Sequence, residues 1–134
     1  LLQSVNAQSI QEQLIGAWTF DYNKSLSNMG QQSKNYYNSK ISSNRKDRLI
    51  RVYKDRKIYF HANGSYQQIL SDGRTSAASW FINNSNNLII KTPEGKLIEF
   101  QIKEIQPNTL TISQINKIGG SMNILFTNWC LIKN

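Results

Sequence analysis

Residues 14–20 read LIGAWTF, and the spacing of their apolar side chains changes at the glycine. From Gly16 onward, apolar and polar positions alternate, so that Trp18 and Phe20 share one face while the residues between them point the other way. Such an alternation with period two is typical of a β-strand with one buried face. The stretch therefore predicts a strand over residues 16–21 that carries Trp18 into the interior.

A short helix is expected directly before this strand. Ser9 and Glu12 have the S-x-x-E spacing of a capping box, in which each side chain accepts a hydrogen bond from the backbone N–H of the other. Gly16 could end this helix in the left-handed conformation or open the strand, and the sequence leaves both possibilities open. In either case the helix is expected to cover one end of the fold, with Trp18 packed above it.

Turn signals divide the chain after residue 57 into short segments, most of them alternating or apolar. They lie at Asn63-Gly64, Asp72-Gly73, Asn86-Asn87, Glu94-Gly95, Pro107-Asn108 and Gly119-Gly120. The segments between them predict seven further strands, over residues 57–62, 65–71, 76–82, 87–92, 96–104, 109–115 and 121–132. Connections this short join antiparallel neighbours.

Eight antiparallel strands can remove their exposed edges by closing into a barrel. We therefore predict an all-β fold: an eight-stranded antiparallel up-and-down β-barrel over residues 9–134, with a short N-terminal helix. Residues 22–56 are expected to form one long basic connection between the first two strands.

Three of these motifs together resemble the lipocalin-like domains of secreted bacterial proteins, which have a calycin-type β-barrel. The motifs are Gly-x-Trp at 16–18, Phe-x-x-x-Gly-x-Tyr at 60–66, and Trp80-Phe81-Ile82. Lipocalins also pair the first tryptophan with an arginine near the end of the last strand, where this chain has only Lys133, so the relationship is distant. The fatty-acid-binding proteins have ten strands and fit less well, because the turns here give eight.

The predicted interior has room for a ligand. Ala78 and Ser76 share the inward face of Trp80, and both are small and lie away from the helix end, where Trp18, Trp80 and Trp129 are all expected. An eight-stranded barrel either is filled by side chains or holds one small molecule. We favour the pocket over the filled core. Its expected ligand-binding wall comprises Phe20, Ile58, Gln68, Ala78, Phe100, Ile112, Met122 and Ile124.

The positive charge of the chain is confined to one segment. The formal net charge is +8, and residues 22–57 hold ten Lys or Arg against two Asp, while basic and acidic residues balance elsewhere. Residues 45–57 are compatible with a helix or with an extended lead into the next strand. We predict a basic gate for an anionic ligand, formed by Arg45, Lys46, Arg48 and Arg51. The alternatives are a patch for a polyanion or protein partner, and a solvated polar loop.

Catalytic chemistry has few candidate residues. His61, the only histidine, lies beside a turn and is expected to face solvent, and Cys130, the only cysteine, is expected in the core. We therefore expect no enzyme activity, no cofactor and no metal site. The expected partner is one small hydrophobic or amphipathic molecule, anionic in character, rather than nucleic acid.

The N-terminal stretch LLQSVNA resembles the tail of a removed export signal, since Val5 and Ala7 fit the small-residue cleavage rule. Residues 1–8 are therefore expected to be a signal-peptide remnant or a disordered tail, and the protein to be secreted or periplasmic. The apolar runs are much shorter than the roughly 18 residues that span a bilayer, so no membrane span is expected.

Overall fold

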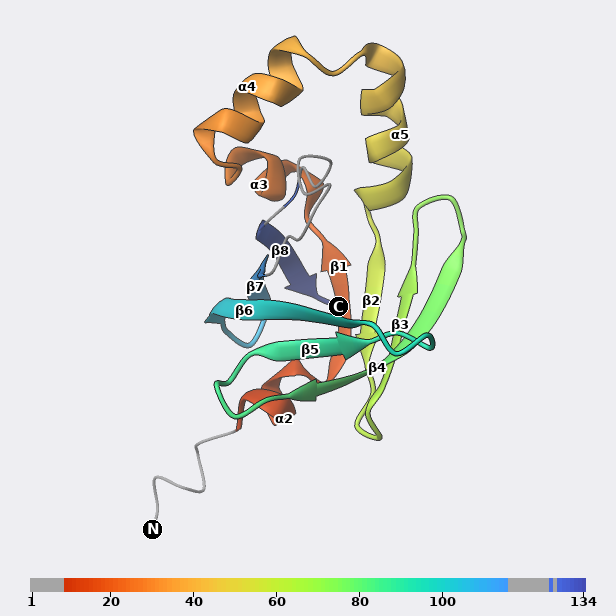
Figure 1. Ribbon diagram of the computed structural model, residues 1–134, viewed down its shortest axis with the longest axis vertical. Helices are drawn as coiled ribbons and strands as arrows, with labels where there is room; N and C mark the ends of the chain where they lie inside the picture. The colour runs from red at the N-terminus through yellow and green to blue at the C-terminus, as the bar shows by residue number, and fades with distance from the viewer. Residues whose placement is uncertain (1–8, 116–125, 127) are drawn as a thin grey trace.

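The computed structural model describes residues 9–115, 126 and 128–134. Within them, eight antiparallel strands form a closed barrel in which β1 to β8 follow one another and β8 pairs with β1 (Figure 1). The strands are β1 (Gly16–Phe20), β2 (Lys57–Phe60), β3 (Ser65–Ile69), β4 (Thr75–Ile82), β5 (Leu88–Lys91), β6 (Leu97–Ile105), β7 (Thr109–Gln114) and β8 (Asn128–Lys133). The predicted all-antiparallel up-and-down barrel is confirmed.

Seven of the eight predicted strands agree closely with β1–β7. The last prediction, over 121–132, agrees only in part, because β8 begins at Asn128. Most of the earlier part of that prediction, including Met122 and Ile124, lies outside the described residues, as does the expected tail over 1–8. Among the described residues, no helix is long and apolar enough to cross a membrane.

The N-terminal helix, α2 (Ile10–Leu14), has the predicted capping box. The Glu12 backbone N–H donates to Ser9 Oγ at 3.1 Å, and the Ser9 backbone N–H donates to Glu12 Oε1 at 3.1 Å. Ile15, the residue after the helix, has φ −57° and ψ 130°, so the chain is already extended before the glycine. Gly16 therefore opens β1 rather than ending the helix, and does so with φ +135°, a conformation that favours glycine.

Trp18 fills the barrel end next to α2, as predicted. Its side chain is fully buried, and its Nε1 donates to the Leu14 carbonyl oxygen at 2.9 Å. The Lys133 ammonium lies 4.7 Å from the centroid of the Trp18 ring and donates to the Ile15 carbonyl oxygen at 2.8 Å. Lys133 therefore supplies a cationic partner to the Trp18 ring.

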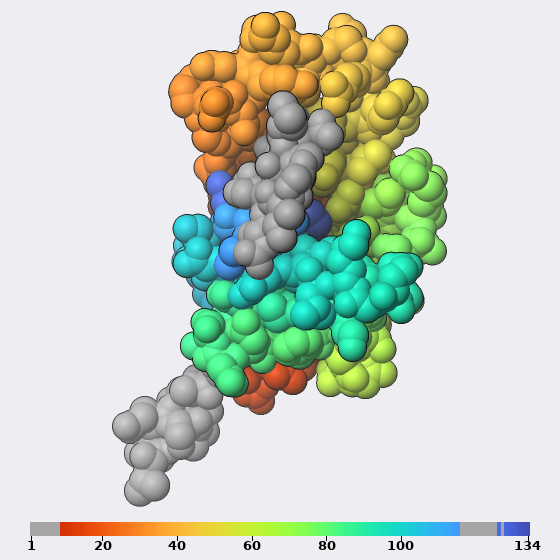
Figure 2. All heavy atoms as spheres, viewed as in Figure 1, coloured from red at the N-terminus to blue at the C-terminus, as the bar shows by residue number. Residues whose placement is uncertain are grey.

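The long connection is helical where a loop was an open alternative. It contains α3 (Tyr22–Ser27), α4 (Gln31–Ser39) and α5 (Ser43–Tyr53), which rise as an arch beyond the barrel end opposite α2 (Figures 1 and 2). Ser42 caps α5, because its side chain accepts from the Arg45 backbone N–H at 3.3 Å. Buried side chains of the arch, such as Tyr22 and Met29, join the barrel core.

Trp129 does not lie near α2, so the prediction that all three tryptophans share that end is wrong. Trp129 packs edge-on against Phe20 and Tyr53 at the end covered by the helical arch, with ring centroids 5.8 and 6.3 Å apart. The reason is the start of β8, which makes Trp129 its second residue. Trp80 is at the predicted end, where its Nε1 donates to the His61 carbonyl oxygen at 3.0 Å.

Replacing the buried ring of Trp18 should destabilise the whole barrel. We expect Trp18→Ala to lower the free energy of unfolding by about 3–5 kcal/mol, the usual cost of truncating a buried aromatic side chain. The matched control is Phe81→Ala on β4, because Phe81 is 44% exposed and should cost less than about 1 kcal/mol. Urea unfolding measures both, and equal losses would contradict the assignment of Trp18 to the barrel floor.

Candidate binding cavity

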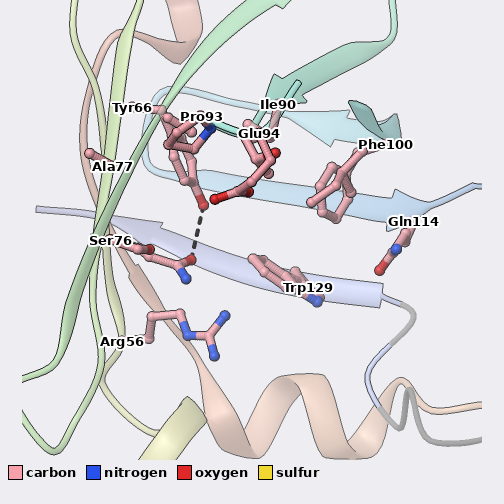
Figure 3. A pocket seen from close by; sticks show the side chains of 14 residues that line it. Arg56, Tyr66, Ser76, Ala77, Ile90, Pro93, Glu94, Phe100, Gln114 and Trp129 are labelled. Atoms are coloured by element: carbon pink, nitrogen blue, oxygen red, sulfur yellow. Dashed lines mark hydrogen bonds between the residues drawn. The ribbon is translucent and has the colours of Figure 1, made fainter. Parts of the chain in front are cut away.

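A cavity of about 440 Å³ opens within the barrel on the side of β3 to β6. Pockets of roughly 300–1,000 Å³ are the usual size of small-molecule sites. The lining side chains come from strands β3 to β8, from the residue before β2, and from the turn between β5 and β6. They are Arg56, Tyr66, Gln68, Ser76, Ala77, Ala78, Ile90, Thr92, Pro93, Glu94, Ile98, Phe100, Gln114 and Trp129 (Figure 3).

The barrel interior is filled on one side and hollow on the other. Phe20 of β1 packs against Tyr53, Phe126 and Trp129, with ring centroids 5.4, 5.4 and 5.8 Å away. These rings occupy the space beside β1, β2 and β8, whereas the cavity adjoins β3 to β6. The sequence left a pocket and a filled core as alternatives. The interior is filled beside β1, β2 and β8 and hollow beside β3 to β6, so each alternative holds for one part of it.

Small side chains of β4 create the space. Ala78 pairs with Tyr66 of β3, and Ser76 pairs with Gln68, so each small residue faces a long one across the strand pair. All four side chains line the cavity. The opposite wall is apolar and includes Phe100, which packs on Trp129 with ring centroids 5.2 Å apart.

Arg56 brings a cation to the cavity wall. Its side chain is 6% exposed, its Nε donates to the Val52 carbonyl oxygen at 3.3 Å, and its guanidinium carbon lies 4.3 and 5.3 Å from the ring centroids of Tyr53 and Trp129. The described residues contain one ion pair, the exposed Arg74–Asp72. Arg56 therefore has hydrogen-bonding and aromatic contacts, and the described residues give it no counter-charge.

Burial lowers the pKa of Arg56, because removing a cation from water disfavours the charged form. The nearby side chains of Tyr53 and Tyr66 act in the opposite direction. An arginine starts from so high a pKa that the guanidinium still keeps its proton. The cavity consequently has a permanent positive charge on one side.

Tyr66 and Gln68 lie on the same wall as Arg56. The Tyr66 hydroxyl donates to Gln68 Oε1 at 3.1 Å, drawn as a dashed line in Figure 3. The amide oxygen of Gln68 is thereby engaged, and its two N–H donors remain for other groups. Burial raises the pKa of Tyr66 well above the ordinary value, while Arg56 partly opposes this, so the hydroxyl stays neutral.

The turn between β5 and β6 forms part of the rim. The Gly95 backbone N–H donates to the Thr92 carbonyl oxygen at 2.9 Å, and the Lys96 backbone N–H donates to Thr92 Oγ1 at 3.1 Å. Glu94 is exposed on this turn and lines the cavity. It is the acidic residue of the lining, so the described cavity has one positive and one negative group.

The predicted ligand-binding residues fall into three groups. Gln68, Ala78 and Phe100 line the cavity together. Phe20, Ile58 and Ile112 are 1%, 1% and 2% exposed and lie in the filled part of the interior rather than on the cavity wall. The physical reason is that the rings of Tyr53, Phe126 and Trp129 occupy that region. Met122 and Ile124 lie outside the described residues.

The predicted basic gate lies on α5, away from the cavity lining. Arg45, Arg48 and Arg51 are exposed, whereas the Lys46 ammonium lies 4.8 Å from the centroid of the Tyr37 ring. None of the four lines the cavity. The last turn of α5 is linked to the cavity wall indirectly, because the Val52 carbonyl oxygen accepts a hydrogen bond from Arg56, which lines the cavity.

The histidine and the cysteine, the side chains best suited to catalysis or metal binding, lie away from the cavity. His61 is exposed at the turn between β2 and β3, stacks on Tyr59 and shares a hydrogen bond with Gln67 Oε1 at 3.1 Å. Cys130 is buried, as predicted, and its Sγ accepts from Asn28 Nδ2 at 3.1 Å. Within the described part of the chain, no group of three or more His, Cys, Asp or Glu could hold a metal ion.

Sequence reasoning counted Arg56 among the basic residues of the connection but did not place it in the cavity. The sequence nevertheless indicates that Arg56 faces inward, because it lies at every-second-residue spacing with Ile58 and Phe60. All three side chains are buried. The same alternation joins Tyr66 to Gln68. Trp129 could not be placed in this way, since its position depends on where β8 begins.

Comparison with protein-family models and with curated proteins finds no match to this chain. The closed eight-stranded barrel is consistent with a calycin-like fold, and the site has to be interpreted from its own geometry.

The buried Tyr66 hydroxyl gives a pH-dependent contribution to stability. Because its pKa is raised in the folded protein, the unfolded chain loses this proton near pH 10 while the folded chain keeps it. We therefore expect the free energy of unfolding to fall as pH rises above about 10. Urea unfolding from pH 9 to 11 measures the slope, and Tyr66→Phe should make it shallower. Identical slopes would contradict the assignment.

Proposed function

We propose that this barrel binds one small hydrophobic or amphipathic molecule in the cavity on the side of β3 to β6. The observation that supports the proposal is an internal space of about 440 Å³ with an apolar wall at Ile90, Ile98 and Phe100 and a polar wall at Arg56, Tyr66 and Gln68. Ligand sites commonly combine an apolar lining with a few polar groups that fix orientation. A molecule with one apolar and one polar end fits both walls.

We propose a binding role rather than a catalytic one. A catalytic serine needs a general base within hydrogen-bond distance. Ser76 is the serine of the cavity lining. Among the described residues, no histidine or carboxylate side chain is hydrogen-bonded to its hydroxyl. The remaining polar groups of the wall are suited to orienting a ligand.

The exposed cations of α5 suit a role in ligand capture. Exposed charges contribute little to affinity, about 0–1 kcal/mol for each ion pair, but they attract an oppositely charged molecule during its approach. Arg45, Arg48 and Arg51 are exposed on the helix whose last turn accepts a hydrogen bond from Arg56, a residue of the cavity wall. We therefore propose that the basic gate speeds association of an anionic ligand.

Filling the cavity at Ala78 should weaken binding while the barrel still folds. Ala78 lines the cavity, so Ala78→Trp is expected to reduce binding of a neutral environment-sensitive probe such as 1-aminoanthracene at least tenfold. Ser79→Trp is the matched control, because Ser79 is the next residue of β4 and is exposed outside the cavity lining. A fluorescence titration measures both variants. Equal binding by Ala78→Trp and the parent would refute the proposed site.

The gate should affect rates more than affinity. The test variant replaces the four gate residues together by Gln: Arg45, Lys46, Arg48 and Arg51. At low salt, this variant should associate with an anionic ligand as slowly as the parent protein does at high salt. The dissociation rate should change little. Stopped-flow mixing with decanoate and with decanol separates charge from chain length, and salt-independent association of decanoate with the parent would contradict the gate.

Polyanion binding by the helical arch is the second candidate function. Residues 22–57 contain ten Lys or Arg, and the ion pair found among the described residues, Arg74–Asp72, lies outside this segment. These cations are therefore not paired with carboxylates in the described structure, which favours polyanion binding. Retention on heparin that is lost in the fourfold Gln variant, without any bound small molecule in native mass spectrometry of the parent, would favour this candidate over the cavity.

A further inference from the structure

We propose that Arg56 is the anion-binding residue of the cavity and that the ligand is a medium-chain amphiphile with a single carboxylate. This inference rests on the proposed binding function and specifies its ligand class. The carboxylate would meet Arg56 and the chain would lie against Ile90, Ile98 and Phe100.

The first argument is the cost of burying Arg56. Its side chain is 94% buried, since 6% is exposed, and a buried charge is strongly unfavourable unless it is paired. The described part of the chain provides no carboxylate within ion-pair distance of it. Arg56 contacts the Val52 carbonyl oxygen and the side chains of Tyr53 and Trp129, and none of these groups supplies a full negative charge. A bound anion would supply it.

The second argument is the position of the guanidinium. The guanidinium carbon lies 4.3 and 5.3 Å from the ring centroids of Tyr53 and Trp129, and the Val52 carbonyl oxygen accepts its Nε–H, so the side chain is restrained from three sides. A guanidinium fixed in this way is prepared to donate its remaining N–H groups in a fork, the geometry that suits a carboxylate. Arg56 lines the cavity, so this fork is accessible to a ligand.

The third argument is the polarity of the surrounding wall. Gln68 keeps its N–H donors because its oxygen accepts from Tyr66, and Ser76 lies beside it on β4. In Figure 3, Arg56 and Ser76 lie at one side of the cavity and Phe100 at the other. Hydrogen-bond donors therefore lie on the side of the cation, and the far side offers the apolar ring of Phe100 with the amide of Gln114 beside it.

The charge count of the cavity favours a monoanion. Among the described residues of the lining, Arg56 is the one cation, and Glu94 on the rim is an acid. A dianion such as a phosphate monoester would leave one charge without a partner and would lie near a like charge. A carboxylate needs only Arg56.

The volume limits the length of the chain. At about 30 Å³ for each non-hydrogen atom, the value for liquid water, a cavity of about 440 Å³ holds roughly fifteen such atoms. Decanoate, with a chain of ten carbons and two carboxylate oxygens, is therefore a suitable probe, and decanol is its neutral counterpart.

The test compares decanoate and decanol on the parent protein and on Arg56→Met by isothermal titration calorimetry at pH 7.5. We expect the parent to bind decanoate about 10- to 100-fold more tightly than decanol, the range for a hydrogen bond to a charged group. Arg56→Met should lose this preference and bind decanol within about threefold of the parent. Lys40→Met, which removes an exposed cation at the end of α4, should keep the preference.

A second variant guards against loss of folding. Arg56→Lys keeps a positive charge but not the planar fork, so it should weaken decanoate binding several-fold while decanol binding is retained. Equal affinity of the parent for decanoate and decanol would overturn the role of Arg56 and leave the proposed function intact, as would a preference that survives in Arg56→Met. Tighter binding of decyl phosphate than of decanoate would overturn the carboxylate class. Binding of none of these molecules would overturn both the inference and the proposed function.

Discussion

The contact between Lys133 and Trp18 joins the last strand of the barrel to the first. β8 pairs with β1 along three residue pairs, and Lys133 is the residue opposite Trp18. Its ammonium lies over the Trp18 ring and donates to the Ile15 carbonyl oxygen, so one side chain connects the last strand, the first strand and the end of α2. A Cβ at Gly16 would lie 2.8 Å from Lys133 Cε, and the glycine thus leaves room for this lysine.

Barrel closure creates an interior that the sequence fills unequally. Trp18 closes one end, and the aromatic cluster of Phe20, Tyr53, Phe126 and Trp129 fills the side nearest β1 and β8. Large rings pack against one another there because the helical arch contributes Tyr53 from outside the sheet. Toward β4 the side chains become small, and the space left between the strands is the cavity. The cavity is therefore a consequence of where bulk is placed in a closed barrel.

Charge is also distributed unequally between surface and interior. Nine of the ten basic residues in 22–57 are exposed or half-buried, where water screens them, and Arg56 alone among them is buried. An exposed cation affects mainly the approach of a ligand, whereas a buried one acts at short range in a less polar medium. The segment can thus attract a ligand with one set of residues and orient it with another.

The sequence by itself determined the barrel, because alternation and turn residues are local properties. The alternation that begins at Gly16 shows where β1 starts and that Trp18 faces inward, and the Asn63-Gly64 turn shows where the chain reverses. None of these inferences needs information about distant parts of the chain. The same local alternation predicts that Gln68 and Ala78 face inward, and both of them line the cavity. It could not distinguish them from Phe20 and Ile58, which also face inward but lie where rings from α5 and β8 fill the space. That distinction, the position of Trp129 and the isolation of the Arg56 charge were decided by the tertiary structure, because each depends on contacts between residues far apart in the sequence.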